Sequence, residues 1–138
     1  MNSIDDVIRI NLDSKKDIRG DLIPIDFRKN LNINIKRSFI VYGCENVVRG
    51  NHAHKECNQF LCCISGICEF NCDDGSNENI HIIDKPSTIL KIPNMIWSSQ
   101  KYKAKNTILL VLCDLEYSEE DYIRDYKKFL EYRDYETN

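Results

Sequence analysis

Two histidines one residue apart carry most of the chemistry available to this sequence. His52 and His54 lie in the segment RGNHAHKECNQF, residues 49–60, and His81 is the only other histidine of the chain. Residues i and i+2 of a β-strand point to the same side, so both imidazoles face one interior if the segment is a strand. A pair placed in this way binds a metal ion, transfers protons, or lines a core without any chemical role.

The residues around the pair argue against a metal site. The spacing resembles the first sequence motif of the cupin superfamily, a group of small antiparallel barrels in which a glutamate completes the metal site. Here that position holds Gln59, a neutral and poorer ligand, and the region of the second motif, KIPNMIWSSQKY at 91–102, contains no histidine. Transition-metal sites normally take three or four protein ligands. We therefore predict no metal, place His81 on the surface, and expect the paired imidazoles to do acid–base work near neutral pH.

The segments that must position the histidine pair have the pattern of short strands separated by turn residues. Nine candidate strands cover residues 6–12, 22–27, 37–43, 59–65, 68–72, 79–84, 87–93, 95–100 and 107–114. Strands at this spacing, with no helical pattern between them, predict an all-β sandwich or barrel. With the cupin resemblance, the expected fold is a cupin-type antiparallel β-barrel or jelly roll that forms a single domain over residues 1–138.

The last part of the sequence has a helical rather than a strand pattern, which predicts a short C-terminal helix. The segment SEEDYIRDYKKFLEYRDY, residues 118–135, begins with Ser118 and has Asp121 three residues later, which is a weak capping signal. Tyr122, Tyr126 and Phe129 then recur at helical spacing. We expect this helix to fold against the barrel through its aromatic residues.

Composition excludes several classes of function. Hydrophobic residues make up 42%, charged residues 30%, and the net charge is -3 with Lys and Arg scattered along the chain, so no nucleic-acid surface is indicated. The start MNSIDDVIRINL has no signal-peptide pattern, and the longest apolar stretch, TILLVLC at 107–113, is too short to span a bilayer. The seven cysteines include no CxxC pair, which predicts reduced, buried thiols in a cytoplasmic protein without a membrane partner.

Three segments together resemble a known enzyme family. RGNHAHKECNQF, PNMIW and YSEEDYIRDYKKFL are similar to the dTDP-4-dehydro-6-deoxyglucose 3,4-ketoisomerases, metal-independent cupins of bacterial deoxyamino-sugar synthesis, over about Gly20 to Leu130. The resemblance implies a dTDP-linked 4-keto-6-deoxy sugar as substrate, no cofactor, and a homodimer with exchanged N-terminal strands. It also implies that a base removes the proton from C3 to give an enediol, and that reprotonation at C4 leaves the ketone at C3. The resemblance implies that His54 is the base and that His52 assists proton transfer or polarises the carbonyl.

The same resemblance supplies candidates for substrate binding. Arg49, His52 and Gln59 are candidate donors to the developing oxyanion. Arg19, Lys55 and Arg124 are candidate cations for the pyrophosphate, since a guanidinium fork suits phosphate oxygens. Trp97 is expected either to contact the ligand or to fill the barrel. Arg19 and Gly20, in DIRGDL at 17–22, resemble the branch that forms the galacto-configured product, dTDP-3-dehydro-6-deoxygalactose.

Two other functions stay open from the residues alone. A dTDP-sugar 3,5-epimerase is also a cupin with an Arg-Gly-x-His segment, although such enzymes usually carry one histidine with a distant acid and a tyrosine. A non-catalytic sugar-binding cupin would bind the nucleotide sugar without turnover. The second histidine and the set of cations favour the ketoisomerase over both.

Overall fold

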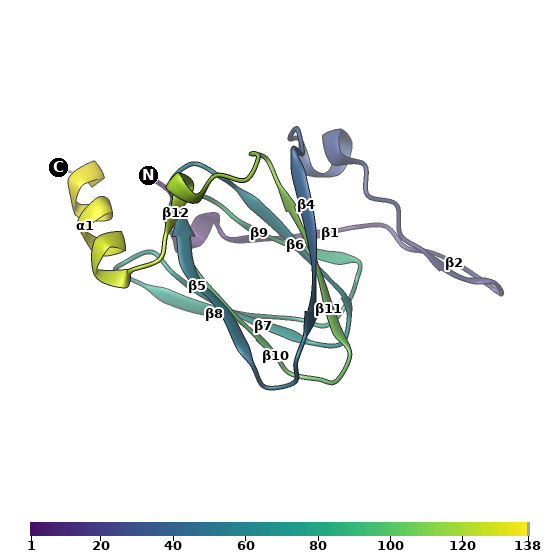
Figure 1. The fold of residues 1–138 in the computed structure, drawn as a ribbon. Helices are drawn as coiled ribbons and strands as arrows, with labels where there is room; N and C mark the ends of the chain where they lie inside the picture. The colour runs from purple at the N-terminus through teal and green to yellow at the C-terminus, as the bar shows by residue number, and fades with distance from the viewer. Residues whose placement is uncertain (138) are drawn as a thin grey trace.

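The computed structural model describes residues 1–137, and its strands form two facing five-stranded antiparallel sheets (Figure 1). The first sheet has the order β1 (Ile8–Asn11), β9 (Thr88–Ile92), β6 (Gln59–Ser65), β11 (Thr107–Cys113) and β4 (Arg37–Gly43). The second has the order β12 (Tyr122–Ile123), β5 (Val48–His54), β10 (Trp97–Tyr102), β7 (Cys68–Asp73) and β8 (Glu78–Ile83). The all-β prediction is confirmed, with the jelly-roll arrangement of two sheets rather than a closed barrel.

The main core lies between the two sheets. Alternate residues of β11 are buried, and Leu109 and Val111 pack against Leu61, Phe70 and Leu90 from neighbouring strands. This alternation follows from the two-residue period of a strand, whose inner face gains the free energy of apolar burial. The seven cysteines are free thiols, of which six are buried and one, Cys44, is exposed. Burial therefore matches the prediction for all of them except Cys44.

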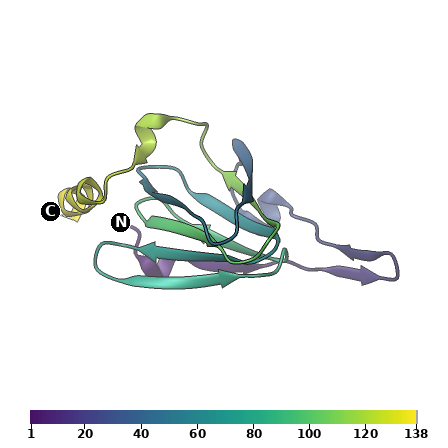
Figure 2. The same ribbon diagram turned by 60° about the horizontal axis from the view of Figure 1, so that its bottom comes forward.

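The N-terminal part of the chain forms one edge of the first sheet and then leaves the body of the molecule. Strand β1 pairs with β9 of the same chain. The hairpin of β2 (Lys15–Asp17) and β3 (Gly20–Leu22) projects away from both sheets, as Figures 1 and 2 show. Ile18 at its tip is fully exposed. The hairpin thus makes its contacts within itself rather than with the body of its own chain.

The segment after the hairpin covers the outer face of the first sheet. Residues 22–27 were predicted as a strand, but β3 ends at Leu22 and a helical turn follows at Phe27–Leu31. Pro24 has no backbone N–H for a strand ladder, and the Asp26 side chain accepts a hydrogen bond from the backbone of Lys29. The apolar side chains of this segment pack on the sheet in a second cluster with Leu12, Phe60, Cys62, Ile89 and Leu112.

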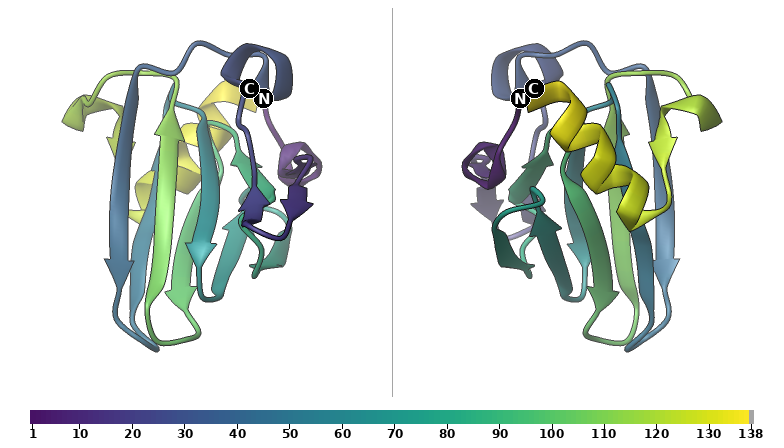
Figure 3. Two further views of the ribbon diagram at one scale, coloured as in Figure 1. Left: turned by 90° about the vertical axis from the view of Figure 1, so that its right-hand side faces the viewer. Right: turned by 90° about the vertical axis from the view of Figure 1, so that its left-hand side faces the viewer.

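The C-terminal helix α1 (Tyr126–Thr137) lies across the side of the molecule where the two termini meet (Figure 3). Phe129 is fully buried against Ala53 and Met95, and Arg133 donates to the backbone oxygen of Asn2. The predicted start at Ser118 is wrong. Asp125 caps the helix instead, because its carboxylate accepts from the backbone N–H of Lys128. Residues 119–121 form a separate 3-10 turn, and no helix within residues 1–137 has the length and apolar character to cross a membrane.

Candidate active site

A cavity of about 450 Å³ lies between the two sheets and is lined by one of the paired histidines. Its walls come from both sheets and from the segment after β11; they comprise Phe39, Ile40, Val41, Arg49, Gly50, His52, Gln59, Leu61, Ser98, Gln100, Val111, Tyr122 and Arg124. A larger surface cleft of about 690 Å³, lined by Lys36, Lys55 and several acids, contains neither His52 nor His54. The smaller cavity is therefore the candidate active site, since it combines an imidazole with amides and guanidinium groups.

The two imidazoles lie edge to face at the end of β5. Their ring centroids are 5.1 Å apart, with an angle of 89° between the ring planes. His52 lines the cavity. His54 does not line it and is 5% exposed, and the centroid of its ring lies 4.3 Å from that of Tyr122. The predicted geometry, in which residues i and i+2 share one strand face, is confirmed.

Asp121 holds His54 in one orientation. Nδ1 of His54 lies 2.9 Å from Oδ2 of Asp121, and the backbone N–H groups of Glu56 and Cys57 donate to the same carboxylate. An ionised carboxylate only accepts hydrogen bonds, so Nδ1 carries the proton and Nε2 keeps its lone pair. Nε2 of His54 is buried without a hydrogen-bond partner among the described residues. This is the arrangement of an oriented imidazole base.

Burial keeps both imidazoles neutral. Desolvation, helped by the neighbouring His54, lowers the pKa of His52 from 6.5 to about 4. Desolvation also lowers the pKa of His54, although the hydrogen bond and the charge of Asp121 act in the opposite direction. Neutral imidazoles at pH 7 are the form that accepts a proton.

An irregularity in β5 sets the direction of the histidine pair. Gly50 and Asn51 both have positive φ, 92° and 58°, and the register with β10 shifts between Ser98 and Ser99. A Cβ atom at Gly50 would lie 3.1 Å from the backbone oxygen of Ser98 and 3.3 Å from Cα of Ser99. Glycine satisfies both the left-handed conformation and the close approach of β10. The RGNH sequence thus explains how His52 turns into the cavity.

Three predicted binding residues lie at the cavity with His52. They are Arg49, Gln59 and Arg124. The Arg124 guanidinium stacks 4.2 Å from the centroid of the Tyr122 ring and pairs with Glu119. The amide nitrogen of Gln59 donates to the sulfur of Cys113 at 3.6 Å.

Two other predicted residues, Lys55 and Trp97, do not line this cavity. Lys55 follows His54 in the chain, and its Nζ lies over the Tyr132 ring at 4.9 Å beside the C-terminal helix. Trp97 precedes Ser98, the residue of β10 that lines the cavity, and packs against Tyr126 and Phe129. For Trp97, the alternation of side chains along the strand turns it away from the face of its cavity-lining neighbour Ser98.

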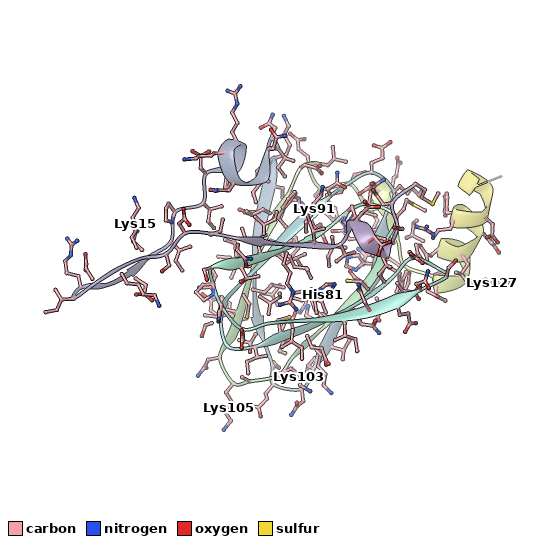
Figure 4. The ribbon with its side chains drawn as sticks, turned by 180° about the vertical axis from the view of Figure 1, so that it is seen from behind. Lys15, His81, Lys91, Lys103, Lys105 and Lys127 are labelled. Atoms are coloured by element: carbon pink, nitrogen blue, oxygen red, sulfur yellow. The ribbon has the colours of Figure 1, made fainter. Side chains whose placement is uncertain are left out.

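Arg19 and Gly20 are also outside the cavity of their own chain. Both lie on the projecting hairpin, where the Arg19 guanidinium pairs with the carboxylate of Asp17. His81, predicted on the surface, is half-buried on β8 (Figure 4). Its Nδ1 accepts a hydrogen bond from Nε of Arg9 at 3.4 Å. It does not line the cavity.

The structure adds three residues that the sequence did not single out for the site. Asp121 looked like a helix-capping residue, and Tyr122 looked like one of the helix's packing aromatics. Arg37 lay in a strand with no chemical signal; its Nη2 donates to the hydroxyl of Tyr122 at 3.4 Å, and its Nε is buried without a partner among the described residues. The only available sign was the family-like run SEEDYIRDY, which does not indicate which of its acids turns inward.

One His–Cys–Asp cluster has potential metal-ligand atoms. Among the described residues, the ligand atoms of His54, Cys57 and Asp121 all lie within 4.8 Å of one another. The carboxylate of Asp121 is already engaged by the imidazole and by two backbone N–H groups. The geometry is that of a carboxylate that orients an imidazole.

Comparison with known proteins yields a family of sugar-modifying enzymes. The family model described as FdtA, WxcM-like, C-terminal, matches residues 5–134. A TDP-4-oxo-6-deoxy-alpha-D-glucose-3,4-oxoisomerase from Aneurinibacillus thermoaerophilus is 33% identical over 124 residues, which cover 89% of each chain. A 3,4-ketoisomerase structure from Helicobacter canadensis is 36% identical, with a TM-score of 0.90, covering 94% of this chain and 98% of that one.

Two further structures are similar to this chain, one at 27% sequence identity and one at 16%. The sugar 3,4-ketoisomerase QdtA from Thermoanaerobacterium thermosaccharolyticum, in complex with TDP, is 27% identical with a TM-score of 0.93, covering 99% of this chain and all of that one. An RmlC epimerase from Mycobacterium tuberculosis is 16% identical with a TM-score of 0.76, covering 88% of this chain and 70% of that one. The second similarity concerns the fold alone.

Proposed function

Because this chain belongs to the FdtA family and is a TDP-sugar 3,4-ketoisomerase, we propose that it acts on TDP-4-oxo-6-deoxyglucose through His54 and His52. The observation that carries the residue assignment is the pair of buried, unpartnered ring nitrogens, Nε2 of His54 and Nδ1 of His52. A buried polar atom without a partner costs free energy. His52 lines the cavity and the His54 ring lies 5.1 Å from that of His52, so a ligand in the cavity is the proposed partner of these nitrogens.

The reaction is a proton relocation without net oxidation. The C4 ketone acidifies the proton on C3, and Nε2 of His54 takes that proton to leave an enediolate. The proton then returns to C4, while the C3 hydroxyl loses its proton and the C4 oxygen gains one, so the ketone ends at C3. His52, which lines the cavity directly, assists by moving the proton between the two oxygens.

The enediolate carries negative charge that the cavity wall stabilises. Arg49 and Arg124 supply guanidinium groups, and Gln59 supplies an amide. The same two arginines serve the pyrophosphate, whose charge suits the fork geometry of arginine. Lys55 and Trp97 have no such role in this proposal, because they point away from the cavity.

We also propose that residues 1–138 act as a single domain that forms a two-fold homodimer. Strand β1 is paired within its own chain, so the hairpin β2–β3 is the part of the N-terminus left to exchange. Its exposed apolar side chains, Ile18 and Leu22, suit burial against a second copy. In that dimer the hairpin would bring Arg19 and Gly20 to the partner's cavity.

The direct test is incubation of the purified protein with TDP-4-oxo-6-deoxyglucose, followed by NMR of the sugar carbons. The expected result is transfer of the carbonyl signal from C4 to C3. A change of configuration at C5 would indicate a 3,5-epimerase instead. Saturable binding of the nucleotide sugar with no new signals would indicate a non-catalytic sugar-binding cupin.

A further inference from the structure

Tyr122 connects the two sheets beside the cavity, and the proton transfers of the proposed reaction do not involve its hydroxyl group. The residue lies on β12, the edge strand of the second sheet, and lines the cavity. Its hydroxyl oxygen lies 3.4 Å from Nη2 of Arg37, which belongs to β4 at the edge of the first sheet. The Tyr122 side chain therefore reaches from one edge strand to the other.

Arg37 continues the inner face of the first sheet beyond the wall of the cavity. Residues 37, 39 and 41 of a strand share one face, and Phe39 and Val41 line the cavity. In the sheet, Arg37 lies opposite Cys113, and Cys113 lies opposite Gln59, another wall residue. Arg37 itself does not line the cavity, so its effect on a bound sugar passes through the residues that it contacts.

The guanidinium of Arg37 sets the direction of the Tyr122 hydroxyl proton. Arginine has only donors and keeps its charge, so the phenol oxygen accepts the hydrogen bond from Nη2. The O–H group of Tyr122 is then left to donate, and it has no acceptor among the described residues. A hydroxyl group that accepts from a fixed donor and keeps its own proton free is an oriented hydrogen-bond donor.

The surroundings of Tyr122 suit a donor to negative charge. The centroid of its ring lies 4.3 Å from that of His54 and 5.2 Å from that of His52. The Arg124 guanidinium lies 4.2 Å from the same centroid, so two guanidinium groups contact one side chain, one at the hydroxyl and one at the ring. A donor that itself accepts a hydrogen bond from a cation is polarised and donates more strongly. Tyr122 therefore places a strengthened O–H group next to both imidazoles.

We infer that Tyr122 is a catalytic residue that donates a hydrogen bond to the C4 oxygen of the sugar, and that Arg37 is the positioning residue that orients its hydroxyl group. The inference rests on the ketoisomerase reaction proposed above. When C3 loses its proton, the C4 oxygen takes the negative charge of the enediolate, and the hydrogen bond from Tyr122 strengthens. The proton stays on Tyr122, so the hydroxyl group is unchanged at the end of the reaction.

Replacement of the hydroxyl group tests the catalytic role. Tyr122→Phe keeps the ring and should lower kcat by roughly 100-fold, the loss that follows removal of one donor to an oxyanion, with the affinity for TDP nearly unchanged. Tyr126→Phe is the matched control, because the Tyr126 hydroxyl donates to Asp73 at 2.6 Å and Tyr126 does not line the cavity. The control should lower the free energy of unfolding and keep the wild-type kcat. A Tyr122→Phe enzyme with the kcat of the control would overturn the catalytic role.

A double-mutant cycle tests the role of Arg37. Arg37→Met keeps an extended side chain without charge or donors and should lower kcat by roughly 10-fold, about the value of one hydrogen bond to a charged group. In the Tyr122→Phe background the same substitution should cost almost nothing further, because no hydroxyl group is left to orient. Circular dichroism establishes that each variant folds. Equal losses of kcat in both backgrounds would overturn the positioning role, since Arg37 would then act independently of Tyr122.

An infrared measurement separates this inference from the ketoisomerase assignment. The probe is TDP-4-oxo-6-deoxyglucose labelled with carbon-13 at C4 and bound to the His54→Asn enzyme, in which turnover should be slow. A hydrogen bond from Tyr122 polarises the carbonyl, so its stretch should lie at lower frequency than in the enzyme that also carries Tyr122→Phe. Equal frequencies, with normal turnover by the wild type, would refute the role of Tyr122 alone. A frequency difference without any C3 ketone product would refute the ketoisomerase function and leave the hydrogen bond established.

Discussion

Nδ1 of His54 lies 2.9 Å from Oδ2 of Asp121, although 67 positions of sequence separate the two residues. The contact joins the end of β5 to the 3-10 turn after β11, and the pairing of Tyr122 with His54 in the second sheet holds the two segments together. It fixes Nδ1 of His54 toward Asp121 and leaves Nε2 as the nitrogen with the free lone pair. Three of the predictions below depend on this relationship.

Replacement of the histidines should separate their roles. His54→Asn should lower kcat by roughly 100- to 10,000-fold, the range that a general base contributes, with nucleotide affinity nearly unchanged. His52→Asn should be impaired less, because His52 assists. Steady-state kinetics and TDP titration measure both effects, and His81→Asn is the matched control outside the cavity. A near-normal rate for His54→Asn combined with an inactive His52→Asn would make His52 the base.

Replacement of Asp121 tests whether it is a positioning residue. Asp121→Asn should lower kcat by roughly 100-fold or more, because the amide can donate to Nδ1 and so favour the tautomer with a protonated Nε2. The acid limb of the pH–rate profile should move as well, which loss of stability alone would not cause. Asp125→Asn is the control: the amide oxygen can still cap α1, and the variant should retain the wild-type profile. A wild-type pH profile in Asp121→Asn would contradict the positioning role.

The pH dependence follows from the lowered pKa values of the two histidines. A base acts in its neutral form, so kcat/KM should stay constant down to pH 6.5 and fall only at lower pH, as His54 gains a proton. The free energy of unfolding should also decrease as the pH falls. Below pH 6.5 the unfolded chain binds protons on its histidines, whereas the folded His52, with a pKa of about 4, stays neutral. The unfolded state is therefore favoured progressively between pH 6.5 and pH 4. Urea unfolding at several pH values measures this. An acid limb centred above pH 6.5 would be inconsistent with buried, neutral imidazoles.

Local pattern was sufficient to predict most strands and the shared face of the histidine pair. The predicted strands at 37–43 and 59–65 match β4 and β6, because alternation and turn residues are local signals. The shared face of His52 and His54 follows from the same two-residue period. Arg49, Gln59 and Arg124 were predicted from family resemblance and lie at the cavity.

What the sequence did not reveal depends on contacts between distant segments. The acids of SEEDYIRDY look alike in sequence, and only the pairing of β12 with β5 brings Asp121 to His54. The bulge at Gly50 is set by the register of β5 with β10, which the periodicity of one strand does not specify. Lys55 lies just beyond β5, which ends at His54, and its side chain contacts Tyr132 of the C-terminal helix.

The projecting hairpin leads to the prediction that the protein is a dimer in solution. Light scattering should give a dimer, and a single 16.2 kDa protomer at micromolar concentration would rule it out.

A second experiment tests whether Arg19 acts on the partner's cavity. If it does, co-expressed Arg19→Ala and His54→Asn chains should recover activity, since each hybrid dimer then contains one site with both residues. Each variant alone should be impaired. Absence of recovery in purified hybrids would confine Arg19 to another role.

The configuration of the product tests the role proposed for Arg19 and Gly20. In deuterium oxide, any label that enters through exchange of the proton held by the base should appear at C4 of the sugar and not at C5, because the proposed base acts on the C3 and C4 positions alone. In ordinary water, the coupling between the protons on C4 and C5 distinguishes the products: an equatorial C4 proton, as in the galacto configuration, gives a small coupling, and an axial one gives a large coupling. We expect the small coupling, since Gly20 leaves room on one face of the ring that a side chain would fill. Deuterium at C5 would assign the protein to the epimerases, and a large coupling would remove Arg19 and Gly20 as the determinants of configuration.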